Sequence, residues 1–413
     1  MIELSMIFLI IITAICIPSL LVLPFLISYI TVRQESKVVP LSAGMALIWG
    51  IAGFCFKNPA TDPDLVRYLS MLRNYFGKSL FESFNLQYEN LFAVDIYFHF
   101  ISKLGNPQFL PAISVFIFYF IILYILADYK RRTELSNGIF SVYVLFVLTA
   151  INFPAVVNGI RWPIACVMIF LAVYRELVQN KRDGWTIFFY IIPVFMHFSM
   201  LAFLALRLAL LIKNKKVIIA MGASVALLPQ IFNILSTRYE KTALGVIGTQ
   251  LRYFIARADM YFQWKQTDVG WADTVRKSIY YRVESWFYYV IVAYFCIIIY
   301  LVIKQERKKG WEKHNVFVLY LTALTIISFT MAAHTYIRFV TPLIASFCCV
   351  SFKLFNKYEK GGLFMLISKS VLVGFALIGI VLNIYLLGTM VALDDYFVNI
   401  FTSGALSYLF QCL

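Results

Sequence analysis

Long apolar runs separated by short polar segments dominate this chain. Most of the runs reach or approach the roughly 20 residues that a helix needs to cross the hydrocarbon core of a bilayer. We predict spans at residues 4–29, 39–56, 109–127, 139–153, 160–174, 217–234, 286–303, 315–333, 336–352 and 363–387. Residues 185–212 are long enough for one tilted span, but the basic residues on both sides favour a hairpin of two helices. The pattern therefore predicts an all-α, polytopic integral membrane protein with about 12 transmembrane helices.

One apolar segment, residues 91–104, is too short for a span and carries Asp95, His99 and Lys103. Such a segment is typical of a re-entrant or amphipathic helix at the membrane surface. Asp95 and His99 share one helix face, but two ligands alone do not indicate a metal site. We also expect a short turn at residues 154–159 that reverses the chain between two spans.

The composition agrees with a membrane protein. Of 413 residues, 62% are apolar and only 14% are charged, against about 25% charged residues in soluble domains. No polar tract is long enough to bury its own core, so residues 1–413 are predicted to form a single membrane domain. The seven cysteines lie mostly in apolar runs without metal or redox spacing, which favours packed free thiols over disulfides.

The distribution of charge orients the spans. Dense basic clusters at residues 130–132 and 304–313 are typical of cytoplasmic loops. Residues 57–106 then form one outer loop and residues 236–284 a second, larger one. The second loop is also basic, which long loops tolerate. Its arginines, Arg252 and Arg257 among them, either bind a negative ligand or face anionic headgroups.

The first outer loop carries the best candidates for chemistry. Asp62 and Asp64 are followed one helical turn later by Tyr68, and Glu89 precedes the short apolar helix. A carboxylate at a partly dehydrated membrane surface has a raised proton affinity and suits a general base. The alternatives are an N-cap role for either aspartate and simple solvation of Glu89.

Two arginines and two histidines are predicted at the outer ends of helices. Arg161 opens one apolar helix and Arg338 lies just inside another. Arginine beside a span marks a site or an ion pair by default, and its planar fork suits phosphate oxygens. His197 in the hairpin and His334 before Arg338 are further candidates, or satisfied residues of the bundle. The sequence has no Walker loop, serine-hydrolase motif, zinc spacing or dinucleotide fingerprint, so soluble nucleotide chemistry is not expected. We expect no cofactor or nucleic acid, and no metal if arginines balance the charge, although the Asp62-Pro63-Asp64 pattern leaves a metal ion open.

Several short motifs together resemble the EpsG-like Wzy polymerases over about residues 40–350. They are Asp64 and Tyr68 after the second span, Glu89 before an apolar helix, the segment Asn158-Gly159-Ile160-Arg161 with Ala165, and Met196-His197-Phe198-Ser199. The intervening Pro63-Asp64-Leu65 leaves open which aspartate corresponds to the family's first-loop position.

The resemblance implies a polysaccharide polymerase in the bacterial cytoplasmic membrane. It implies polyprenyl-pyrophosphate-linked oligosaccharides as donor and acceptor, with bond formation on the outer face. Membrane lipids and a chain-length regulator protein are further candidate partners. Two other classes stay open, a glycosyltransferase of the GT-C kind that uses a lipid-phosphate sugar, and a lipid-linked oligosaccharide flippase. A membrane acyltransferase with His197 or His334 as base is a third choice.

Overall fold

The computed structural model is helical throughout the part of the chain that it describes, with no strand there. It describes residues 25–57, 64–84, 86, 91–211, 278–306, 312–329, 336–358, 362–391, 393 and 396. The chain divides into two compact units, residues 1–197 with 351–413 (unit 1) and residues 198–350 (unit 2). The all-α class predicted from the apolar runs is confirmed.

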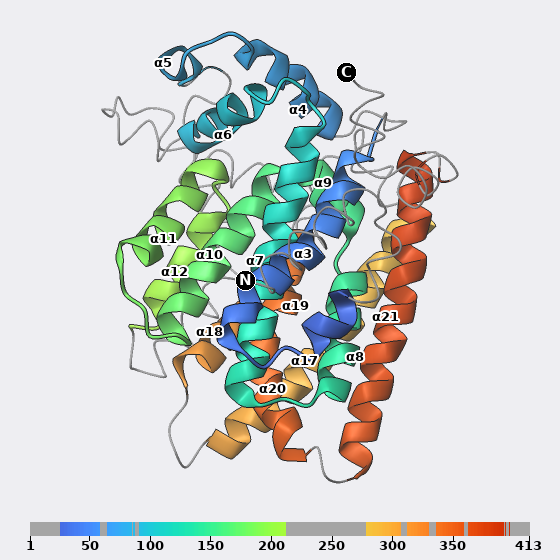
Figure 1. The fold of residues 1–413 in the computed structure, drawn as a ribbon. Helices are drawn as coiled ribbons and strands as arrows, with labels where there is room; N and C mark the ends of the chain where they lie inside the picture. Colours follow the sequence, from blue (N-terminus) through green and yellow to red (C-terminus); the bar gives the residue numbers. More distant parts are fainter. Residues whose placement is uncertain are drawn as a thin grey trace, which may run out of the picture. The chain divides into compact units, whose positions relative to one another are not determined.

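Figure 1 labels the described helices, most of which belong to unit 1 by their residue numbers. Those of unit 1 are α3 (Glu35–Phe54), α4 (Asp64–Leu72), the 3-10 turn η1 (Arg73–Tyr75), α5 (Leu80–Ser83), α6 (Phe92–Ser102), α7 (Phe109–Thr133), α8 (Asn137–Ala150), α9 (Phe153–Gly159), α10 (Arg161–Leu177), α11 (Gly184–Met196) and α21 (Leu363–Met390). Unit 2 contains α12 (Met200–Ala209), α17 (Ile279–Glu306), α18 (Lys313–Ser328) and α19 (Ile337–Ser346). Helix α20 (Cys348–Tyr358) begins in unit 2 and continues into unit 1.

Five described segments are long and apolar enough to cross a membrane: α3, α7, α17, α19 with α20, and α21. The pair α8 and α9, bent by 54°, is a sixth candidate if it forms one span. The protein is therefore a polytopic membrane protein. The total of about 12 spans stays a prediction, because segments such as 4–29 and 217–234 lie mostly or wholly outside the described residues.

Close helix packing in unit 1 depends on small residues. Along α3, a Cβ added at Gly53 would lie 2.9 Å from the Pro111 carbonyl oxygen of α7, so only glycine lets the two backbones approach this closely. Trp49 of α3 stacks on Tyr119 of α7 with ring centroids 4.5 Å apart. Tight packing of small and aromatic side chains is the main source of helix association in lipid, where the hydrophobic effect between helices is weak.

Residues 154–159, predicted as a turn, form helix α9, so that prediction was wrong. Asn152 caps α9 by accepting a hydrogen bond from the Ala155 amide at 2.8 Å. Pro154 occupies the first turn, where proline costs no helical hydrogen bond. The cap and the proline together start a new helix in the segment that was predicted as a short turn.

The bend between α8 and α9 is held by Asn383 of α21. The Asn383 side chain accepts from the Phe153 amide at 2.8 Å and donates to the Thr149 carbonyl at 2.7 Å. A broken helix at membrane depth is tolerated only if its freed backbone groups find partners. Asn383 supplies them, and it thereby fixes the direction in which α9 leaves α8.

Candidate functional site

Helix α4 of the predicted first outer loop is held against the junction of α9 and α10. The backbone amide of Leu65, in the first turn of α4, donates to the Asn158 side-chain oxygen at 2.7 Å. The first amides of a helix have no partner within the helix and must be satisfied from outside. Asn158 supplies this partner from 93 residues away in the sequence.

The junction itself is a strained turn. Ile160, between α9 and α10, has φ 38° and ψ −69°, a conformation that β-branched residues rarely adopt. Gly159 before it has no room for a side chain, since an added Cβ would lie 2.1 Å from Nε1 of Trp162. Strain of this kind persists only where the surrounding structure holds it, and it is concentrated at functional sites. The turn places Arg161 as the first residue of α10.

Arg161 meets Tyr68 of α4 in two ways. Its Nε donates to the Tyr68 hydroxyl oxygen at 3.1 Å, and its guanidinium carbon lies 5.4 Å from the centre of the Tyr68 ring. Tyr68 is buried, whereas Arg161 is partly exposed. A phenol orients a guanidinium without cancelling its charge, so this contact with Tyr68 leaves the charge of Arg161 intact.

Asp64 and Arg67 lie on the solvent side of the same helix. Their side chains form an ion pair at 2.7 Å, and each is about half exposed. Such exposed pairs contribute little to stability. The guanidinium of Arg67 also lies 5.4 Å from the centre of the Tyr68 ring. Helix α4 therefore presents a carboxylate and a second arginine beside the Tyr68–Arg161 contact.

The structure brings three of the sequence-predicted site residues into one region, namely Asp64, Tyr68 and Arg161. His197 is buried and ends α11, with its amide bonded to the Pro193 carbonyl at 2.9 Å. The helix therefore breaks within the segment 185–212, and the hairpin itself stays a prediction. Five other predicted residues lie outside the described part of the chain: Asp62, Glu89, Arg252, Arg257 and His334.

Arg338 lies in unit 2, in the first turn of α19, and is partly exposed. The residue that precedes this helix, Tyr336, donates its hydroxyl proton to Glu284 of α17 at 3.2 Å. The Ser285 hydroxyl donates to the Tyr336 oxygen at 3.1 Å. These two hydrogen bonds hold Tyr336 against α17 and so position the start of α19, the helix that carries Arg338.

Glu284 is 1% exposed, and the sequence did not single it out as a site residue. It was assigned to the end of the outer loop 236–284, whereas α17 begins at Ile279. The sequence does contain a pattern that predicts the burial of Glu284. Glu284 lies at helical spacing with Tyr280, Phe287 and Ile291, and all four residues are buried on one face of α17. A buried carboxylate next to a predicted span is costly and is a candidate for function.

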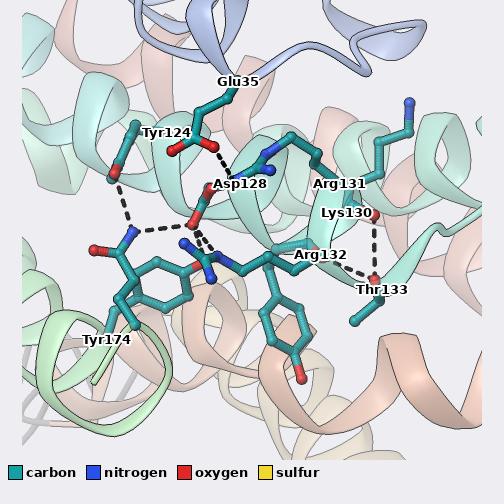
Figure 2. Close-up of polar contacts among 10 residues, drawn as sticks. Glu35, Tyr124, Asp128, Lys130, Arg131, Arg132, Thr133 and Tyr174 are labelled. Atoms are coloured by element: carbon teal, nitrogen blue, oxygen red, sulfur yellow. Dashed lines mark hydrogen bonds and ion pairs between the residues drawn. The ribbon is translucent and has the colours of Figure 1, made fainter. Parts of the chain in front are cut away.

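A cluster of polar side chains that was not predicted from the sequence surrounds Asp128, near the end of α7 (Figure 2). Its carboxylate accepts hydrogen bonds from four donors: Arg131 and Gln179 at 2.9 Å, and Arg132 and Tyr174 at 2.7 Å. Arg131 also pairs with Glu35 of α3 at 3.2 Å. The side chain of Asp128 is 5% exposed. Here a carboxylate neutralises the arginines, and the cluster fastens α3, α7 and α10 to one another.

A neighbouring lysine supports the same end of α7. Lys130 is buried and donates to the carbonyls of Ile30 and Val32 at 2.6 and 3.1 Å, and to the Asn137 side chain at 2.8 Å. All three donors of the ammonium group are therefore used. Within the described residues, no group of three His, Cys, Asp or Glu side chains is placed to hold a metal ion.

Comparison with known proteins gives one match. The sequence model of the EpsG family matches residues 41–385, which is more than half of the chain. No curated protein and no solved structure matches. The matched range includes α4, the α9–α10 junction and α19, so the Tyr68–Arg161 contact and Arg338 both lie inside it.

Proposed function

The chain belongs to the EpsG family, and from this premise we propose that it polymerises polyprenyl-pyrophosphate-linked oligosaccharide repeat units by glycosyl transfer. The proposed location is the bacterial cytoplasmic membrane, with the reaction on its outer face. The basic clusters at residues 130–132 and 304–313 support this orientation, since such clusters favour the cytoplasmic side.

The observation that carries the proposal is the contact between Arg161 and Tyr68. In the proposed reaction the acceptor hydroxyl oxygen attacks the anomeric carbon of the donor, and the bond from that carbon to the pyrophosphate oxygen breaks. Negative charge builds up on the departing pyrophosphate. A guanidinium that is already oriented by Tyr68 stabilises this charge without having to reorganise, and its fork fits two phosphate oxygens at once.

Other residues complete the proposed site. Arg338, with Arg252 or Arg257 and with His334, would add contacts to the donor pyrophosphate. The acceptor hydroxyl would lose its proton to one of four candidate bases, Asp62, Asp64, Glu89 or His197. Since polyprenyl pyrophosphate is a good leaving group, the reaction needs neither a nucleotide nor a nucleotide sugar.

The test uses purified full-length protein in lipid nanodiscs, supplied with lipid-linked repeat units. Polymerisation predicts a ladder of lipid-linked products that differ by one repeat unit, and the Arg161→Lys variant gives no ladder. Addition of a single sugar would instead support a glycosyltransferase of the GT-C kind. In proteoliposomes, transfer of the lipid-linked unit across the bilayer without growth would support a flippase. Either result overturns the proposal.

A further inference from the structure

The segment between α3 and α7 forms a layer of short helices at one membrane surface. Since α3 and α7 are consecutive candidate spans in the described chain, the end of α3 and the start of α7 lie on the same side of the bilayer. Helices α4, α5 and α6 lie together there (Figure 1). The longest of them has 11 residues, which is about 16 Å of helix and too short to cross the roughly 30 Å hydrocarbon core.

Polar side chains hold the inside of this layer together. Asp95 of α6 is 0% exposed and accepts a hydrogen bond from the Tyr75 hydroxyl. The Ser83 hydroxyl of α5 and Nδ1 of His99 lie 2.9 Å apart, and both residues are buried. These contacts tie η1 and α5 to α6, and they add buried polar groups to an interior that also contains apolar side chains such as Phe98.

Many large apolar side chains are exposed on the outside of the same layer, beside charged residues such as Asp64 and Glu82. Phe81 of α5 is 91% exposed and Phe100 of α6 is 60% exposed. Other large apolar side chains that are more than a third exposed accompany them: Phe76, Leu80, Phe84 and Leu104. Phe98 is buried with Asp95 and His99, whereas these other phenylalanines stay exposed on a surface that also carries charged residues. Exposed phenylalanines beside charged side chains are typical of short helices that lie in the membrane interface.

Basic residues border this apolar surface. Arg73 and Lys103 are exposed, and Lys78 is partly exposed. The ammonium group of Lys103 donates to the Lys78 carbonyl at 2.9 Å, which brings the loop before α5 next to the end of α6. Aromatic side chains next to lysine and arginine are the combination that binds the interface of an anionic bilayer.

We propose that the layer formed by α4, η1, α5 and α6 rests in the headgroup region of an anionic phospholipid bilayer. Phe81, Phe84 and Phe100 contact the acyl chains, and Arg73, Lys78 and Lys103 contact the headgroups. This docking holds α4, and with it Tyr68, at the depth of the lipid phosphates. The inference rests on burial and charge and does not depend on the proposed polymerase activity.

The test places a nitroxide spin label at position 81 through Phe81→Cys, in full-length protein in nanodiscs that contain phosphatidylglycerol. Collisions with oxygen, which concentrates in lipid, are compared with collisions with a water-soluble nickel chelate. Arg182→Cys, at a side chain that is 69% exposed between α10 and α11, is the water-facing control. Unsubstituted protein gives the background from native cysteines.

The expected result is that oxygen collisions exceed nickel collisions at position 81, with the opposite order at position 182. In nanodiscs of phosphatidylcholine alone, the oxygen preference at position 81 decreases. A nickel preference at position 81 in phosphatidylglycerol overturns the proposal, and an equal oxygen preference in both lipids overturns its electrostatic part. Phe100→Cys gives the same measurement if the first variant does not fold.

Discussion

The two ends of helix α10 use arginine differently. Arg161 begins the helix, and Tyr174 near its end belongs to the Asp128 cluster, 13 residues or about 20 Å away. At the Asp128 end, two guanidinium groups donate to one buried carboxylate. At the Arg161 end, the guanidinium donates to the neutral hydroxyl of Tyr68.

From this difference we propose a structural role for the arginines at the Asp128 end and a role in substrate binding for Arg161. Arginines that share a buried carboxylate have their charge compensated, and breaking such a group is costly to stability. The hydrogen bond from Arg161 to Tyr68 orients the guanidinium through a neutral group, and a guanidinium fork suits the oxygens of a phosphate. We therefore expect substitutions at the Arg161 end to change activity and substitutions at the Asp128 end to change stability.

The largest effect is expected for Arg161→Lys. Lysine keeps the positive charge but loses the planar fork, and loss of one group that stabilises transition-state charge lowers rates about 100-fold or more. The measurement is the rate of chain extension in nanodiscs, together with the unfolding temperature. The matched control is Arg132→Lys in the Asp128 cluster, which should lower the unfolding temperature and leave the rate within a few-fold of wild type. A wild-type rate in Arg161→Lys would remove Arg161 from the site.

The next effect is expected for Asp128→Asn. The neutral side-chain amide of asparagine cannot balance the positive charges of Arg131 and Arg132, whose side chains are 22% and 35% exposed. Breaking a fully buried ion pair costs about 3–5 kcal/mol, and we expect about 2 kcal/mol here because solvent reaches both arginines. Reversible unfolding in detergent measures the loss.

Tyr174→Phe is the control for Asp128→Asn. It removes one of the four hydrogen bonds to the carboxylate and should cost about 1 kcal/mol. If Asp128→Asn were as stable as wild type and lost activity instead, the distinction between the two ends of α10 would fail.

A smaller effect is expected for Asn158→Ala. This substitution removes the acceptor for the Leu65 amide and so weakens the contact that holds the start of α4. Loss of a helix cap of this kind lowers the free energy of unfolding by about 1 kcal/mol. Because α4 carries Tyr68, we expect the extension rate to fall about tenfold. Asn158→Asp keeps the acceptor oxygen and should restore the unfolding temperature. An unchanged rate in Asn158→Ala would show that α4 is positioned by other contacts.

The smallest effect concerns pH and the Asp183 carboxylate, in the turn that follows α10. The hydrogen bond from Arg175 and those from the Thr186 amide and hydroxyl lower the pKa of Asp183 to about 2. A carboxyl whose pKa is lower in the folded protein than its ordinary value of about 4 stabilises the fold above that value. This contribution is lost as the pH falls from about 4 to about 2.

Unfolding temperatures between pH 5 and pH 2 test this expectation. The wild-type protein should lose slightly more stability over this range than Asp183→Asn, which keeps the cap of α11 but carries no charge. The difference should be small because Asp183 is about half exposed. Parallel curves for the two proteins would contradict it.

The fold class and the main helices could be predicted from the order of residues. Apolar runs in lipid must satisfy every backbone group internally, so they form helices, and the predicted runs 39–56, 109–127 and 363–387 coincide with α3, α7 and α21. The short helix predicted at 91–104 is α6. The order of short motifs along the chain also predicted that the protein belongs to the EpsG family, and the match to the family model confirms it.

The tertiary structure alone decided which polar residues meet. The partners Tyr68 and Arg161 are 93 residues apart in the chain, and Asp128 and Gln179 are 51 apart. Nothing in local periodicity specifies such pairs, because they depend on how helices from distant parts of the chain pack. The helix at 153–159 has local start signals in Asn152 and Pro154, whereas the bond between its Phe153 amide and Asn383, 230 residues further along the chain, depends on the tertiary structure. Hydrophobic spacing fixes where a helix forms, while the satisfaction of buried polar groups fixes which residues come together.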